Sequence, residues 1–161
     1  MITVRPAVPE DHVNISVLVV SSFRQPNESN LIRALRKSGE LAVELVAVAK
    51  AGLVGHVALS RMVSPENWLA LGPVCVRPEN AGQGIGHELI LHGIDAARRA
   101  KFDAIVVVGD PDYYRRFGFV FGGPAELISP YPRQYTGLYP IKPAVAAAHA
   151  VLQYPDAFGE V

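Results

Sequence analysis

The sequence predicts one mixed α/β domain over residues 1–161, with a twisted central sheet flanked by helices. A length of 161 residues, of which 50% are hydrophobic, suits a single domain with a full core. An apolar stretch at 68–76 leads through a glycine-rich loop into a helical pattern, and a second apolar stretch follows at 104–108. This order is typical of a βαβ unit with parallel strands. Valine-rich stretches at 41–49 and 53–62 predict an antiparallel hairpin, so the sheet is expected to be mixed.

Three elements are expected before the hairpin. A β-branched run at 2–5 predicts a short strand. Acidic residues then precede an apolar stretch, which favours a helix at about 11–23. A second helix is expected at 28–37, where apolar and basic residues occupy opposite faces and Gly39 follows as a stop signal.

The strand at 68–76 is interrupted by the pair Gly72-Pro73. Proline cannot donate a ladder hydrogen bond and glycine weakens a strand interior, so a bulge or splay is expected beside the glycine loop. Ligands of open α/β sheets bind at the carboxyl ends of parallel strands, so a ligand of this βαβ unit is expected there.

The chain after the second parallel strand carries weaker signals. Asp110 or Asp112 is expected to cap a short helix at the start of the next segment, and Gly118 is expected to end it. The aromatic run at 119–121 is expected to resume a strand. Prolines and tyrosines then dominate, and no structure is assigned to residues 124–150. A last strand is expected at 151–154.

Composition and charge exclude several classes of partner. Fifteen basic residues balance fifteen acidic ones, so no global field attracts nucleic acid or an anionic membrane. The single Cys75 rules out an internal disulfide and fits a small buried strand residue in a reducing cytoplasm. The start of the chain lacks the pattern of a signal peptide, and no apolar stretch is long enough to span a bilayer. These features together predict a cytoplasmic protein. No pair of histidines has the spacing of metal ligands, so no metal is expected.

The glycine loop has the chemistry of a phosphate site. Gly82, Gly84 and Gly86 alternate with other residues just before a helix. Glycines let successive backbone N–H groups turn toward one point, and the helix start adds a partial positive charge. An anion would therefore be held through the backbone.

Two familiar phosphate motifs do not fit this loop. The dinucleotide fingerprint needs a third glycine three residues after the second, and this sequence has His87 or Leu89 there, depending on the register. The P-loop needs Gly-Lys-Ser/Thr at the helix start, and no lysine follows Gly86. A nucleotide-binding βαβ domain is therefore disfavoured.

The loop resembles motif A of the GNAT superfamily of N-acetyltransferases, written Gln/Arg-x-x-Gly-x-Gly/Ala. Gly84 and Gly86 match its glycines, while Ala81 departs from the opening Gln/Arg. The departure removes a side chain near the phosphates and leaves the backbone amides in place. In this family the loop amides hold the pyrophosphate of acetyl-CoA, which the resemblance implies as the cosubstrate here.

A second, independent segment also resembles GNAT enzymes. They carry Tyr-x-x-x-Gly-Phe after the strand that follows the motif A helix, and Tyr114, Gly118 and Phe119 have this spacing. Val54-Gly-His56 and Tyr154-Pro-Asp-Ala-Phe158 are similar to a bacterial subgroup of these enzymes. The resemblance implies the GNAT fold, whose central mixed sheet is splayed between two parallel strands, here the strand that ends near Val76 and the strand that ends near Val108.

The resemblance implies transfer of an acetyl group to a primary amine by direct attack in a ternary complex. The tetrahedral intermediate needs hydrogen-bond donors, and the backbone of the irregular strand supplies candidates. A tyrosine phenol can protonate the departing thiolate, so Tyr114 is the candidate general acid. The candidate cofactor-binding residues are Val74, Cys75, Val76, Ala81, Gly82, Gln83, Gly84, Ile85 and Gly86.

The general base and the acceptor are left open. The candidate bases are Glu28 and Asp110, and Glu44 is a further carboxylate. Glu28 resembles a subgroup position on the acceptor side, and Asp110 lies at a strand end beside the gap. Small-molecule, peptide and protein amines all remain possible acceptors, because fold does not fix substrate. Whether the chain forms a homodimer is equally open. A non-catalytic acyl-CoA binding or sensing module is the competing hypothesis.

Overall fold

The computed structural model describes residues 1–160, which contain a six-stranded sheet in the order β1-β2-β3-β4-β5-β7. Neighbouring strands are antiparallel except β4 and β5, which are parallel, so the sheet is mixed as predicted. The strands are β1 (Thr3–Pro6), β2 (Leu41–Ala49), β3 (Gly52–Arg61), β4 (Trp68–Val76), β5 (Ala104–Val108) and β7 (Thr136–Pro140).

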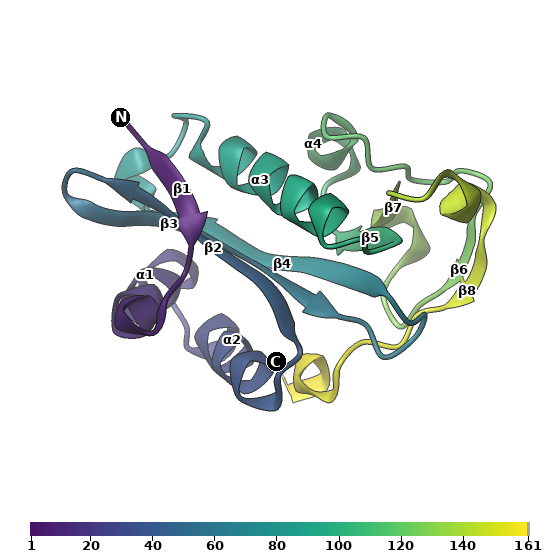
Figure 1. Ribbon diagram of the computed structural model, residues 1–161, viewed down its shortest axis with the longest axis horizontal. Helices are drawn as coiled ribbons and strands as arrows, with labels where there is room; N and C mark the ends of the chain where they lie inside the picture. Colours follow the sequence, from purple (N-terminus) through teal and green to yellow (C-terminus); the bar gives the residue numbers. More distant parts are fainter. Residues whose placement is uncertain (161) are drawn as a thin grey trace.

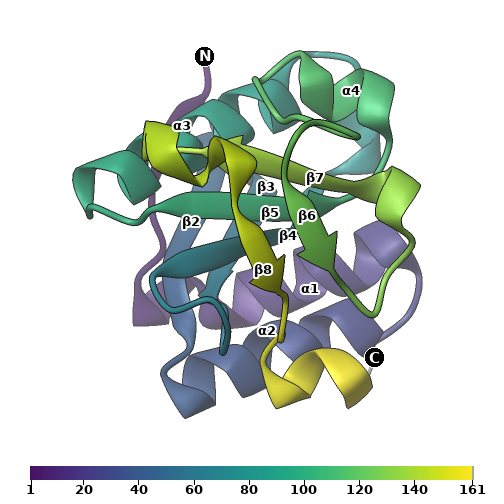
Figure 2. The same cartoon turned by 90° about the vertical axis from the view of Figure 1, so that its right-hand side faces the viewer.

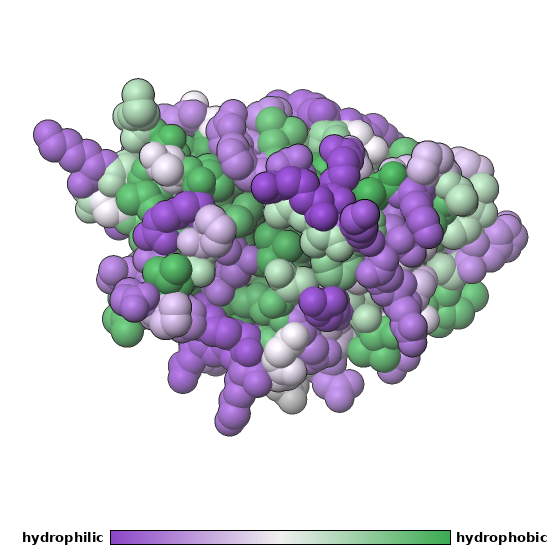
Figure 3. Space-filling view, viewed as in Figure 1, coloured by the Kyte–Doolittle hydropathy of each residue, from purple (hydrophilic) through white to green (hydrophobic). Residues whose placement is uncertain are grey.

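Helices cover both faces of the sheet (Figure 1). On one face lie α3 (Ile85–Arg99) and the short α4 (Pro111–Arg115); on the other lie α1 (His12–Phe23) and α2 (Asn27–Ser38). Hydrophilic residues cover much of the surface seen in Figure 3, and hydrophobic residues show mainly in its middle, over the strands. None of the helices within residues 1–160 is long and apolar enough to cross a membrane.

Alternation along the strands divides the core into layers. Leu69 and Leu71 of β4 pack with Leu89 and Ile90 of α3, all of them buried. Cys75 turns to the other face and joins the cluster formed by α1 and α2. Its side chain is buried, which confirms the interpretation as a small core residue, and burial raises the pKa of its thiol to about 11.

The C-terminal segment forms a second, two-stranded sheet on the face that α1 and α2 occupy. Strand β6 (Glu126–Ile128) pairs in parallel with β8 (His149–Val151), and the 3-10 helix η5 (Asp156–Glu160) follows. Figure 2 shows β6 and β8 crossing in front of β4 and β5, with the yellow η5 next to α2. This segment closes one side of the gap between the parallel strands.

Two expected strands near the C-terminus are wrong. Residues 119–121 form only an isolated bridge between Val120 and Leu138, because Gly118 and Gly122, with φ of 105° and 68°, turn the chain on either side. The last strand is β8 rather than 151–154. It pairs beside β6, and Gln153 then makes a single bridge to Ser64.

Candidate active site

The sheet opens between β4 and β5, as predicted. The two strands pair from Trp68 opposite Ala104 to Leu71 opposite Val107, and the pairing ends there. Gly72, with φ of 136°, and Pro73 follow, and the register between β3 and β4 shifts at this point. From Val74 onward β4 continues beside β3, while within residues 1–160 no strand pairs with its other edge. The irregular Gly-Pro pair therefore produces the opening.

The free edge of β4 presents backbone polar groups to this opening. The N–H of Arg77 donates to the carbonyl of Val54 in β3 at 2.7 Å. Since N–H groups alternate between the two edges of a strand, those of Val74 and Val76 face away from β3, whereas that of Cys75 faces toward it. Val74 and Val76 are thus the strand residues that offer N–H groups to a ligand in the gap.

The glycine loop lies at the start of α3. Gly82 and Gly84 both adopt φ of 78°, the left-handed region that favours glycine. Gly84 is the N-terminal cap of α3 and no side chain caps the helix, so its first N–H groups are available to an anion. Ala81 and Gln83 are exposed on this loop, while Ile85 is buried and fixes the helix against the sheet. A Cβ atom at Gly86 would lie 3.4 Å from the hydroxyl oxygen of Tyr113.

Helix α4 places Tyr114 beside the opening. Its ring packs edge-on against Phe119, with ring centres 5.7 Å apart. It also lies over Gly109, where a Cβ would come within 2.5 Å of the ring, so glycine is required there. Burial raises the pKa of Tyr114 to about 12, and the phenol is therefore protonated at neutral pH.

A cavity of ≈ 360 Å³ occupies the opening and brings Tyr114 and Glu28 together. Asp110 does not line it; this carboxylate caps α4 and accepts the N–H of Asp112 at 3.0 Å. The lining comprises Ala70 to Val74 of β4, Val106 and Val108 of β5, Phe23, Glu28 and Leu31 of the first two helices, Tyr114, and Tyr131, Tyr154 and Phe158 of the C-terminal segment.

Comparisons with known proteins agree with this geometry. The model of the Acetyltransferase (GNAT) family matches residues 11–119, which include the glycine loop, Tyr114 and both parallel strands. The chain belongs to the GNAT family of acetyltransferases. N-acetyltransferase YhbS of Escherichia coli is 33% identical over 133 residues, covering 80% of each chain.

Two solved GNAT structures share the fold closely. The crystal structure of Escherichia coli YhbS in complex with CoA has a TM-score of 0.91 at 28% identity, covering 98% of this chain and 92% of that one. A GNAT acetyltransferase from Brucella melitensis in complex with acetyl-CoA has a TM-score of 0.84 at 30% identity, covering 98% of both chains. The GNAT fold expected from the two motifs is thereby confirmed.

The third carboxylate, Glu44, is not among the residues that line the cavity and instead joins elements of the fold. Its Oε2 lies 2.8 Å from Nε2 of the fully buried His56 and 2.6 Å from Nη2 of Arg36. Burial alone would raise the pKa of Glu44, but the hydrogen bonds with His56 and Arg36 outweigh it and lower the pKa. This network joins α2 to β2 and β3.

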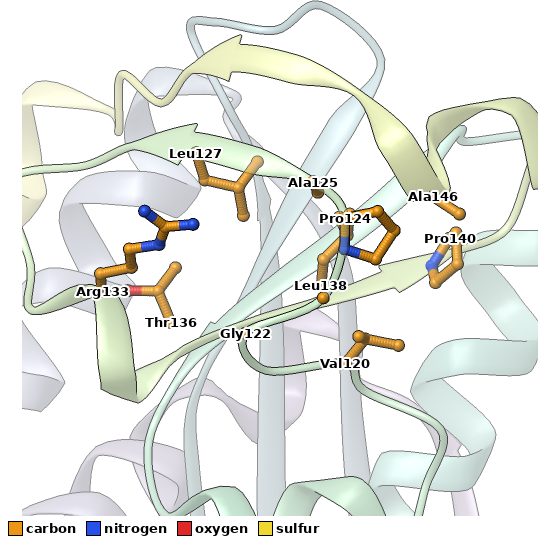
Figure 4. A pocket seen from close by; sticks show the side chains of 11 residues that line it. Val120, Gly122, Pro124, Ala125, Leu127, Arg133, Thr136, Leu138, Pro140 and Ala146 are labelled. Carbon is orange, nitrogen blue, oxygen red and sulfur yellow. The ribbon is translucent and has the colours of Figure 1, made fainter.

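A separate small cavity of ≈ 70 Å³ lies between β7 and the segment that carries β6 (Figure 4). Apolar side chains such as Leu127, Leu138 and Pro140 surround it, and Arg133 stands at one end. None of the site residues expected from the GNAT motifs lines it. Val74, Tyr114 and Glu28, which were expected at the site, line the larger cavity in the opening of the sheet.

Sequence analysis missed the aromatic wall of the site. Phe23, Tyr131, Tyr154 and Phe158 come from distant segments, and only Tyr154 and Phe158 were part of a segment that resembled a GNAT subgroup. The sequence signal for this wall was the recurrence of tyrosines between prolines after residue 124, in a segment without a periodic pattern.

Proposed function

We propose that this protein transfers the acetyl group of acetyl-CoA to a primary amine by direct attack in a ternary complex. The observation that carries the proposal is one cavity that joins a phenol and a carboxylate, at the point where β4 and β5 separate. Its support comes from two relatives whose structures contain CoA and acetyl-CoA. Residues 1–161 would act as one catalytic domain.

The cosubstrate would lie along the glycine loop and the free edge of β4. The pyrophosphate would accept hydrogen bonds from the loop and from the first turn of α3, where the helix dipole favours negative charge. The pantetheine amides would pair with the edge of β4, as a strand partner would. Ala81 offers no side-chain donor, so the phosphates would depend on the backbone amides.

In the reaction the amine nitrogen attacks the thioester carbonyl and forms a C–N bond, and the carbonyl electrons move to oxygen. The N–H group of Val74, where the strands separate, would hydrogen-bond the oxyanion, and that of Val76 would be left for the pantetheine arm. Collapse of the intermediate breaks the C–S bond, and CoA leaves as a thiolate. The nitrogen would lose its second proton to solvent as the amide forms, and the hydroxyl of Tyr114 would give the thiolate its proton and be reprotonated from solvent.

The high pKa of Tyr114 bears on this last step. A phenol with a pKa of about 12 is a poor acid for a thiol with an ordinary pKa of about 8.5. The thiolate would form in the same desolvated opening, and burial raises thiol pKa values too, as it does for Cys75 at about 11. Burial of the thiolate beside Tyr114 would narrow the difference between the two pKa values.

Glu28 would accept the proton of the incoming ammonium, directly or through one water molecule. It lines the cavity with Tyr114, and its carboxylate is held by the Gln25 amide at 2.9 Å. Asp110 is the weaker candidate because it serves as a helix cap outside the cavity lining.

The proposal is tested by the rate of thiol release from acetyl-CoA with a panel of primary amines. Amine-dependent release, with one acetylated amine formed per CoA, is expected. A sensing module would bind acetyl-CoA and release no thiol with any amine, which would overturn the proposal. Tighter binding of NAD or ATP than of CoA would instead favour a nucleotide-binding protein.

A further inference from the structure

The cavity has a cofactor end and an acceptor end. The cofactor end is formed by the separated strands, whereas the acceptor end is formed by α1, α2 and the C-terminal segment on the opposite face from α3 (Figure 2). Phe23, Glu28, Tyr131, Tyr154 and Phe158 line the acceptor end. Three of these residues lie beyond residue 119, where the match to the family model ends. The acceptor wall is thus built largely by a part of the chain outside the common family core.

Charge at the acceptor end is limited to one carboxylate. Among the lining residues, all within the described part of the chain, Glu28 is the single charged residue, and no basic side chain lines the cavity. The Glu28 carboxylate accepts two hydrogen bonds from the Gln25 amide, at 2.9 and 3.1 Å, and makes no ion pair within residues 1–160. An ammonium group at this position would supply the missing counter-charge.

Aromatic rings form the rest of the acceptor wall. Tyr131 and Tyr154 meet edge to face with ring centres 5.0 Å apart, and Phe158 lies 5.3 Å from Tyr154. Burial raises the pKa of Tyr131, and raises that of Tyr154 to about 12, so both are neutral phenols at neutral pH. Aromatic rings pack well against other rings, so this wall suits an apolar, aromatic body whose ammonium pairs with Glu28.

The same surroundings disfavour three other kinds of acceptor. A second ammonium would lie against Leu31 and Phe158 without a carboxylate partner. A substrate carboxylate would face Glu28 without a basic residue among the lining residues. An extended peptide would leave its backbone groups unpaired against aromatic side chains.

We infer that the acceptor is a small primary amine with one positive charge and an aromatic body, an arylalkylamine in chemical class. The inference rests on the proposed acetyl transfer and specifies its acceptor. Glu28 binds the ammonium next to the thioester, and the rings of Tyr131, Tyr154 and Phe158 enclose the body. A cavity of ≈ 360 Å³ has room for a molecule of this size beside the acetyl group.

The test compares kcat/KM at saturating acetyl-CoA for four amines. 2-Phenylethylamine is the probe, phenylalanine adds a carboxylate to the same body, 1,4-diaminobutane replaces the ring with a second ammonium, and a tripeptide offers a free N-terminus. We expect 2-phenylethylamine to exceed each of the others by about 10- to 100-fold. A higher kcat/KM for any of the other three would overturn the inference.

A variant then tests the aromatic wall. Phe158→Ala is expected to raise the KM for 2-phenylethylamine at least about tenfold and to leave the Kd for acetyl-CoA unchanged. Phe158→Leu keeps apolar volume and covers the case in which the alanine variant does not fold. The matched control is Tyr135→Ala, which removes an exposed ring outside the cavity lining and should change neither constant. Equal effects of the 158 and 135 variants would contradict the inference.

The inference and the proposed function fail in different ways. Acetyl-CoA binding and thiol release with the diamine, the amino acid or the tripeptide, but not with 2-phenylethylamine, would overturn the acceptor class alone. Thiol release with none of a broad amine panel would overturn the acetyl-transfer proposal itself, and the acceptor class with it.

Discussion

At the scale of single residues, the proposed reaction depends most on the hydroxyl of Tyr114. Tyr114→Phe removes the proton donor and keeps the ring that packs against Phe119. We expect kcat to fall about 10²-fold or more while the Kd for acetyl-CoA stays the same, because the general acid acts only after binding. Steady-state rates and calorimetry measure the two quantities. Tyr135→Phe, at an exposed tyrosine outside the cavity, is the matched control and should change neither.

The glycine loop offers a second test at this scale, with an unusually close control. Gly84 has φ of 78° and ψ of 12°, and Gly39 at the end of α2 has φ of 80° and ψ of 10°. Alanine at either position costs about 1–2 kcal/mol of backbone strain, so both variants should lose similar stability. Only Gly84→Ala should also weaken acetyl-CoA binding, because only Gly84 belongs to the phosphate loop. Equal Kd values for the two variants would contradict the assigned loop.

The sequence predicted those residues whose role follows from local spacing. The glycines of the loop and Tyr114 lie at fixed distances from one another along the chain, so their motifs were visible without a structure. The choice between Glu28 and Asp110 was different in kind. The helix cap at Asp110 is a local contact that the sequence predicted, whereas only tertiary packing puts Glu28 in the cavity.

At the scale of elements, helix α2 carries Glu28 and Leu31 to the site and is tied to the sheet by Glu44. Glu44→Ala leaves the fully buried His56 and the Arg36 guanidinium without their carboxylate. Removing one partner of a buried ion pair lowers the free energy of unfolding by about 3–5 kcal/mol. Because Glu44 and Arg36 are partly exposed, we expect a decrease near the lower end, about 3 kcal/mol. Urea unfolding measures the loss.

The control for this element is an exposed pair on α3. Asp95 and Arg99 form an i,i+4 ion pair with Nε–Oδ2 of 3.0 Å, and both side chains are more than half exposed. Asp95→Ala should cost no more than about 0.5 kcal/mol, since solvent screens such pairs. A loss for Glu44→Ala no larger than that of Asp95→Ala would show that the buried network does not fix α2.

The elements up to β5 follow strong periodic or apolar signals and were predicted nearly to their ends. The C-terminal elements were not. Prolines and glycines break the alternation in β7 (Thr136–Pro140), and β6 and β8 have only three residues each, too few to show a period. Their position across the sheet opening depends on packing of Leu127 and Leu152 against the sheet, which no local pattern records.

At the scale of the whole molecule, acid stability depends on the ion pair that fixes the first strand. Asp11 Oδ2 accepts from Arg5 at 2.7 Å and from the Val8 N–H at 2.9 Å. The Arg5 hydrogen bond lowers the pKa of Asp11 to about 2, although burial opposes this, whereas an unfolded aspartate has a pKa of about 3.9. The unfolded state therefore binds the proton first, and stability is lost as pH falls from about 4 toward 2.

We expect Asp11→Asn to lower stability at neutral pH and to flatten its dependence on pH between about 4 and 2. Urea unfolding at a series of pH values measures both effects. Glu10→Gln, at the exposed neighbouring residue, is the control and should leave the curve as in the wild type. A curve for Asp11→Asn as steep as that of the wild type would show that another group dominates the acid transition.

The most direct test of the central claim is thermal unfolding with acetyl-CoA, CoA, NAD and ATP in separate samples. A ligand at about a hundred times its Kd adds about 2.7 kcal/mol, which raises Tm by about 5–10 °C for a chain of this length. The account predicts that acetyl-CoA and CoA raise Tm and that NAD and ATP do not. An unchanged Tm at millimolar acetyl-CoA, or an equal rise with ATP, would contradict a CoA site in the opening between β4 and β5.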